Sequence, residues 1–154
     1  MQRDALTISV GPQVCQNLRE ALRLEWLETN GLGGYASSTV AGCHTRRYHG
    51  LLVVTLPGLP GRYVLLSKFE DSVLVRDHEF PLACHRYPGV YHPHGHQYLQ
   101  EFRQAACPAW RYQIGELELE KSVMLLYGRN TVLVRYALRR SPVTVVLRLK
   151  PLLA

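Results

Sequence analysis

The chain has 154 residues, of which 47% are apolar and 19% are charged, and its formal net charge is +6. This length fits one domain, which can bury about 70% of the surface of its unfolded chain. No run of residues is long and apolar enough to cross a membrane, and the first residues lack the hydrophobic stretch of a secretory signal peptide. We therefore expect a cytoplasmic single-domain protein with no membrane partner. The four cysteines, which form no CxxC motif, are expected to be reduced and partly buried.

Arginine supplies most of the positive charge, because only three of the 18 basic residues are lysines. A basic chain is compatible with nucleic-acid binding. The basic residues are scattered, however, and the densest groups are the pairs Arg46-Arg47 and Arg139-Arg140. We expect no nucleic-acid partner, and a basic nucleic-acid-binding β-domain stays the weaker alternative.

Along the chain, Asn17-Leu-Arg-Glu20 fits a capping box and predicts one short N-terminal helix that ends near Leu24. The rest reads as short strands between turns, at residues 51–56, 63–69, 72–76, 110–114, 117–126, 131–138 and 143–149. Gly115-Glu116 predicts a tight hairpin between two of these strands. An antiparallel meander with one polar face must cover its apolar face with another sheet. The sequence therefore predicts an all-β fold, an antiparallel β-sandwich, in which Trp26 and Trp110 belong to the core.

The densest motif is residues 30–52, NGLGGYASSTVAGCHTRRYHGLL. Such glycine density indicates backbone at positive φ or in close contact with another group. Arg46, Arg47, Tyr48 and His49 are typical of a surface that binds an oxygen-rich partner. On a strand, Arg46 and Tyr48 would share one face, and Arg47 and His49 the other. The alternative is structural: one arginine forms a buried ion pair and His49 bonds to the backbone.

Residues 31–36 also match the GxGxxA fingerprint of dinucleotide-binding proteins. The residues that follow, Ser37 to Gly42, are poor helix formers, so no helix N-terminus would face a pyrophosphate. No acidic residue lies between Gly50 and Gly61, where the ribose partner is expected. We therefore expect tight β-structure here and no cofactor.

Several segments resemble the N-terminal domain of bacterial and archaeal glycogen-debranching enzymes, the amylo-α-1,6-glucosidase family. They are residues 23–27, 30–35, 40–42, 45–52, 86–89, 92–93, 119–121, 130–132 and 151–154. Departures from the pattern are Ser38, Cys43-His44, His94 and His96. The resemblance covers nearly the whole chain.

The resemblance implies a supersandwich-like β-domain, here residues 1–154, that precedes a helical-barrel catalytic domain. The family trims α-1,6 branch points of glycogen, in some cases after 4-α-glucanotransferase action, with carboxylates of the helical domain. We therefore expect a fragment without catalytic residues that braces the catalytic domain and forms one wall of the cleft for α-glucan (glycogen, limit dextrin). The substrate-binding or domain-interface residues implied are Asn30, Gly33, Gly34, Tyr35, Arg46, Arg47, Tyr48 and His49. A stand-alone carbohydrate-binding module and a relative acting on another glycan are the alternatives.

Two other groups of residues suggest chemistry less strongly. His92-Pro-His-Gly-His96 has three imidazoles, but Pro93 and Gly95 break regular structure and no acidic or cysteine ligand is near in sequence, so we expect no metal site. Glycoside hydrolysis needs two carboxylates, and the first candidate, Glu70-Asp71, is expected at a strand end and turn. Tyr87 and Tyr91, in a loop, are candidate sugar-stacking residues.

Overall fold

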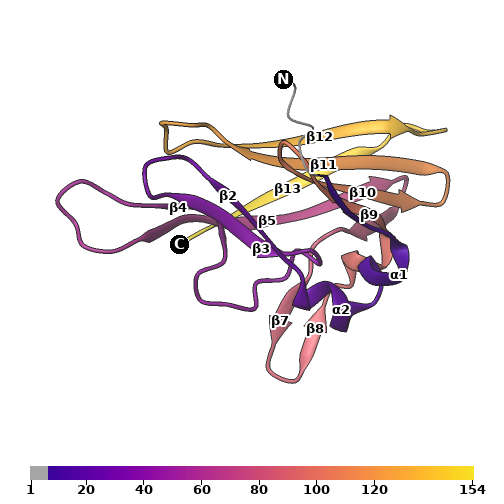
Figure 1. Cartoon of the computed structure of the whole chain (residues 1–154). Coiled ribbons are helices and arrows are strands. Elements are labelled where there is room, and N and C mark those ends of the chain that lie inside the picture. The colour runs from indigo at the N-terminus through magenta and orange to yellow at the C-terminus, as the bar shows by residue number, and fades with distance from the viewer. Residues whose placement is uncertain (1–6) are drawn as a thin grey trace.

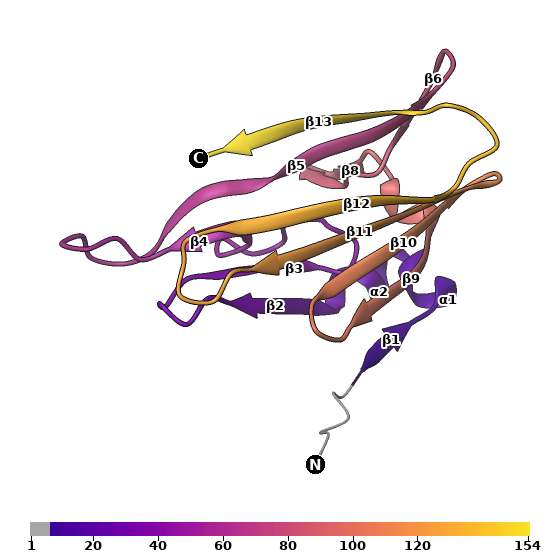
Figure 2. The same ribbon diagram turned by 90° about the horizontal axis from the view of Figure 1, so that it is seen from above.

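The computed structural model describes residues 7–154, which form two β-sheets packed face to face, with two short helices at one side (Figure 1). Viewed from above, the strands of the two sheets run in similar directions (Figure 2). Strand pairing is antiparallel throughout this part of the chain. The predicted antiparallel β-sandwich is therefore confirmed. The start of the chain, on which the expectation about a signal peptide rests, lies outside the described residues.

Five strands make up the first sheet. In spatial order they are β1 (Ile8–Val10), β9 (Leu99–Gln104), β10 (Pro108–Ile114), β11 (Leu117–Leu125) and β12 (Val132–Arg140). Gly115 has a φ of 58° and closes the β10–β11 hairpin, as predicted. Along β11 the buried side chains of Leu117 and Leu119 alternate with Glu118 and Glu120, so this sheet has one apolar face.

The second sheet contains six strands. In spatial order five of them are β2 (Glu25–Thr29), β3 (Tyr35–Thr39), β4 (Gly50–Val54), β5 (Tyr63–Val75) and β13 (Val146–Leu153), and β6 (His78–Pro81) pairs with β5. The two strands expected at residues 63–69 and 72–76 are thus one 13-residue strand. The prediction that Glu70-Asp71 lies at a strand end and turn is wrong, because both residues lie within β5. The Asp71 carboxylate accepts hydrogen bonds from Lys121 and Tyr136 on the facing sheet.

Two helices and a small hairpin complete the fold. Helix α2 (Leu18–Arg23) begins as predicted at Asn17, whose side chain accepts a hydrogen bond from the Glu20 N–H (3.3 Å). Helix α1 (Pro12–Cys15) was not predicted; its signal is the proline at the first helical position. A hairpin of β7 (His85–Tyr87) and β8 (Val90–His92) and a 3₁₀ turn (Gly95–Tyr98) lie between β6 and β9 in the sequence. Among residues 7–154, no helix has the length and hydrophobicity needed to span a bilayer.

The core lies between the two sheets. Trp26 on β2 and Trp110 on β10 are each 4% exposed, and their ring centroids lie 5.3 Å apart in an edge-to-face arrangement, which confirms both as core residues. The Trp110 indole also donates to the Val40 carbonyl oxygen (2.9 Å), which ties the loop after β3 to the first sheet. Burial of one such side chain contributes about 1.5–3 kcal/mol. The described cysteines Cys15, Cys43, Cys84 and Cys107 form no disulfide, and only Cys107 is partly exposed.

Candidate functional site

The glycine-rich motif forms the two loops that flank β3. Residues 30–34 join β2 to β3, and residues 40–49 join β3 to β4. Thr39 closes the start of the second loop, since its hydroxyl donates to the Cys43 carbonyl (2.8 Å) and accepts from the Cys43 N–H (3.1 Å). Residues 46–49 form a turn in which the His49 N–H donates to the Arg46 carbonyl (3.2 Å). The expected strand alternation across these four residues is therefore wrong.

Asn30 lies fully buried at the base of the first loop. Its side-chain oxygen accepts from the N–H groups of Leu32 (2.9 Å) and Gly34 (3.0 Å). Its side-chain nitrogen donates to the Arg129 carbonyl (3.1 Å) and to the Asn130 Oδ1 (2.9 Å). Both donors and both acceptor positions of the amide are thus used within the protein. Asn30 joins two loops that are a hundred residues apart in sequence, and it has no capacity left for a sugar.

Gly33 and Gly34 let the loop backbone lie close to neighbouring groups. Gly33 has a φ of 82°, a left-handed conformation that other residues rarely adopt. A Cβ added to Gly34 would lie 2.6 Å from the Asn30 Nδ2 and 3.0 Å from the Val53 carbonyl oxygen. Gly33 and Gly34 therefore shape the loop around Asn30 and β4, and Gly33 offers its carbonyl to Arg62 (3.1 Å).

Tyr35, Arg47 and Tyr48 line one open cleft of about 820 Å³. The Tyr35 hydroxyl donates to the Tyr48 carbonyl (2.9 Å), which fixes the turn against β3. The Tyr48 side chain is 67% exposed, and Arg47 is also exposed. We name this feature the Tyr48 cleft. Its lining residues are Tyr35, Arg47, Tyr48, Val53, Gly61, Arg62, Tyr63, Val64 and Ala154.

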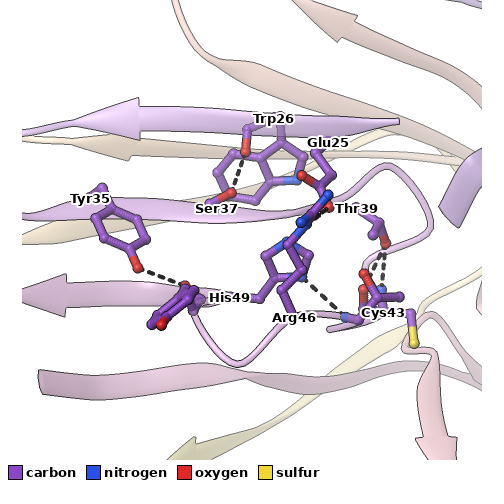
Figure 3. Close-up of polar contacts among 10 residues, drawn as sticks. Glu25, Trp26, Tyr35, Ser37, Thr39, Cys43, Arg46 and His49 are labelled. Atoms are coloured by element: carbon purple, nitrogen blue, oxygen red, sulfur yellow. Dashed lines mark hydrogen bonds and ion pairs between the residues drawn. The ribbon is translucent and has the colours of Figure 1, made fainter. Parts of the chain in front are cut away.

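Arg46 and His49 point toward β2 and converge on Glu25 (Figure 3). The Arg46 Nε lies 2.5 Å from the Glu25 Oε1, and the His49 Nε2 lies 3.5 Å from the same oxygen. The other ring nitrogen of His49 accepts the Thr45 N–H (3.1 Å). Burial lowers the pKa of His49, against the opposing effect of the Glu25 carboxylate. His49 thus bonds to the backbone, as the structural alternative has it, whereas the ion pair of Arg46 with Glu25 is largely exposed rather than buried.

Sequence reasoning missed Arg62 and Tyr63, which also line the cleft. Arg62 lies over the Tyr35 ring, with its guanidinium carbon 5.8 Å from the ring centroid. Tyr63 donates its hydroxyl to the Pro60 carbonyl (3.1 Å). Both residues follow the turn at residues 57–61, and they come beside Tyr35 because β4 pairs with β3 on one side and with β5 on the other. The available signal was an arginine-tyrosine pair directly after a Pro-Gly turn.

The carboxylates of Glu70 and Asp71 have separate structural partners. Asp71 is 2% exposed, and its Oδ2 accepts from the Lys121 ammonium (2.6 Å) and the Tyr136 hydroxyl (2.8 Å) across the sandwich. Burial, followed by the charge of Asp71, raises the pKa of Tyr136, which keeps the phenol protonated as a donor. Glu70 lies 3.2 Å from Lys150 and 3.6 Å from His85. Neighbouring residues of a strand face opposite sides of the sheet, so these two carboxylates do not converge.

The histidines of the 92–96 segment lie near one another but do not converge on one point. The His92 and His94 rings have centroids 6.2 Å apart, and the His94 and His96 rings 5.7 Å apart. His94 contacts the Tyr91 carbonyl (2.7 Å), and His96 is buried in the 3₁₀ turn. No group of three or more metal-ligating side chains within residues 7–154 is placed to hold an ion.

Comparison with known proteins agrees with this picture of the chain. The family described as glycogen debranching enzyme N terminal matches residues 24–154, which includes both flanking loops of β3 and the whole Tyr48 cleft. No curated protein and no solved structure matches the chain significantly. Because the family match extends over most of the sequence, the chain belongs to the glycogen debranching enzyme N-terminal family.

Proposed function

We propose that this chain is the α-glucan-binding, non-catalytic part of a glycogen-debranching enzyme and that the Tyr48 cleft contacts the glucan. The observation that carries the proposal is the cleft itself, which gathers an exposed tyrosine and two arginines from two separate segments, one with Arg47 and Tyr48 and one with Arg62. Tyrosine rings offer a flat apolar face to a pyranose ring, and guanidinium groups donate to its hydroxyl oxygens. The family match supports glycogen as the polymer.

Hydrolysis of the α-1,6 bond is assigned to a separate helical catalytic domain. A glycosidase places two carboxyl groups about 5–10 Å apart on either side of the scissile bond. No acidic side chain lines the Tyr48 cleft within the described chain. The most suggestive pair, Glu70 and Asp71, is committed to lysine, histidine and tyrosine partners. Alone, the chain is expected to release no glucose.

Contact with that catalytic domain is the second part of the proposal. Large apolar side chains are exposed in or next to the segments that line the cleft, where contact with another protein surface would cover them. They are Leu32, Leu59, Leu65 and Leu153, with exposed fractions of 39–74%. The chain would thus brace its partner with the rim of the cleft and present the cleft floor to the glucan. Transferase activity, where the whole enzyme has it, would use the same bound glucan.

The test is glycogen affinity electrophoresis of the chain and of single variants. Tyr48→Ala and Arg47→Ala are expected to abolish most of the retardation by glycogen while the thermal midpoint stays unchanged, because both side chains are exposed. Arg140→Ala is the matched control, since Arg140 is exposed at the end of β12 and outside the cleft. Equal retardation of all variants would refute the cleft as the glucan site.

Tyr87→Ala separates this proposal from a carbohydrate-binding module that uses the β7–β8 hairpin. Tyr87 is 49% exposed and lies outside the Tyr48 cleft. Loss of retardation in Tyr87→Ala alone would move the sugar site to that hairpin. In the intact enzyme, Arg47→Ala is expected to reduce debranching more than it reduces stability, and unchanged kinetics would remove Arg47 from the site.

A further inference from the structure

The walls of the Tyr48 cleft carry positive charge without a compensating acidic side chain. Arg47 and Arg62 both line it, and the other lining residues are tyrosines, valines, glycine and alanine. Arg47 makes no hydrogen bond or ion pair with any other residue in the described range 7–154. Arg62 uses one N–H on the Gly33 carbonyl and lies over the Tyr35 ring, contacts that leave most of its donors free. The cleft therefore holds two guanidinium groups available to a ligand.

Several other exposed arginines are paired with carboxylates. Arg103, Arg135 and Arg139 all lie within 4.0 Å of Glu120. Arg46, one residue before Arg47, is paired with Glu25. Arg47 and Arg62 differ from these arginines because neither forms an ion pair with an acidic side chain of residues 7–154.

The hydrogen-bonding groups of the cleft favour an acceptor-rich ligand. The hydroxyls of Tyr35 and Tyr63 already donate to the Tyr48 and Pro60 carbonyls, so the donors left are mainly the two guanidinium groups. A neutral sugar hydroxyl both donates and accepts, and it is usually met by carboxylates or amides as well as by cations. A phosphate monoester only accepts once fully ionised, and it matches the guanidinium fork through two parallel hydrogen bonds.

We propose that the Tyr48 cleft binds a glucose unit that carries a phosphate monoester, with the sugar ring against Tyr48 and the phosphate on Arg47 and Arg62. The inference rests on the proposed glucan-binding function and names a narrower ligand for the same site. The phosphate belongs either to a free sugar phosphate or to a phosphorylated position of an α-glucan. These two sources share the chemistry that the cleft recognises.

Isothermal titration calorimetry of the unmodified chain tests the inference with matched ligands. Glucose 6-phosphate is compared with glucose and with inorganic phosphate, and phosphorylated maltodextrin is compared with maltoheptaose. We expect each phosphorylated sugar to bind at least tenfold more tightly than its neutral counterpart and than inorganic phosphate. We also expect the affinity to fall as sodium chloride rises from 50 to 500 mM, since salt screens exposed charges. The tighter of the two phosphorylated ligands identifies the source.

Variants then test whether Arg47 and Arg62 bind the phosphate group. Arg47→Ala and Arg62→Ala are each expected to weaken phosphorylated ligands at least tenfold and maltoheptaose less than threefold, while Arg140→Ala changes neither. Equal binding of neutral and phosphorylated ligands would overturn the inference and leave the glucan site intact. Inorganic phosphate binding as tightly as glucose 6-phosphate would show a nonspecific anion site and overturn it too. Binding of none of these ligands would overturn the inference together with the proposed function.

Discussion

Replacement of Asn30 by alanine should destabilise the fold strongly, because its amide makes four hydrogen bonds while fully buried. Each lost bond costs about 1 kcal/mol where water can replace the partner, and about 2 kcal/mol where a buried group is left unpaired. The Gly34 N–H is buried, and the other three partners are partly buried. Allowing for partial hydration, we expect a loss of about 3 kcal/mol in the free energy of unfolding. For a chain of this length the thermal midpoint would fall by roughly 6–12 °C.

Urea unfolding followed by tryptophan fluorescence measures this loss, since Trp26 and Trp110 report on the core. Asn130→Ala is the matched control, because it removes one of the four partners and should cost about 1 kcal/mol. An Asn30→Ala chain within 0.5 kcal/mol of the original would refute the structural role. If that stable variant also lost glycogen binding, Asn30 would be a sugar contact.

Three further substitutions test the packing around the site. Lys121→Met should cost about 3 kcal/mol in urea unfolding, because it leaves the Asp71 carboxylate buried with its charge uncompensated. Gly95→Ala should prevent normal folding, seen as loss of the cooperative thermal transition, since its Cβ would lie 2.0 Å from the Leu82 carbonyl oxygen. His44→Gln should flatten the pH dependence of stability between pH 7 and 5. Burial lowers the pKa of His44 from 6.5 to about 3, so the unfolded chain takes up the extra proton below pH 6.5 and stability falls by up to about 1.4 kcal/mol per pH unit.

Controls for these substitutions use exposed positions. Lys150→Met breaks the largely exposed pair with Glu70 and should cost less than about 1 kcal/mol. Gly58→Ala meets no atom within 4 Å and should cost only about 1 kcal/mol of backbone strain at its φ of 77°. The packing described here would be contradicted if Lys121→Met or Gly95→Ala lost no more stability than its control. It would also be contradicted if His44→Gln showed the same pH dependence of stability as the original chain.

The sandwich was predictable because local signals agree with it. The capping residues of α2, the Gly115 turn and the two core tryptophans were all visible in the sequence. Strand β9 was missed because its buried residues, Leu99 and Phe102, are three positions apart, which breaks the two-residue period of a strand. The structure explains the spacing by an irregularity in the β9–β10 register.

The candidate site was only partly predictable, because neighbouring motif residues have different roles. Arg46 and Arg47 are adjacent and chemically identical, yet one pairs with Glu25 and the other lies in the cleft. A turn, which local residue types alone did not indicate, sends their side chains to different places. Arg62 joins the site because β4 pairs with both β3 and β5, and the sequence did not indicate that this would bring Arg62 beside Tyr35.

The most direct test of the central claim is glucose release from glycogen limit dextrin. The chain is assayed alone, then mixed with a separately expressed catalytic domain of the same enzyme, with Tyr48→Ala and Arg140→Ala in parallel. We predict no release from the chain alone, release from the mixture, less release with Tyr48→Ala, and full release with Arg140→Ala. Release by the chain alone would contradict the account, and Glu70 and Asp71 would then be the first carboxylates to replace.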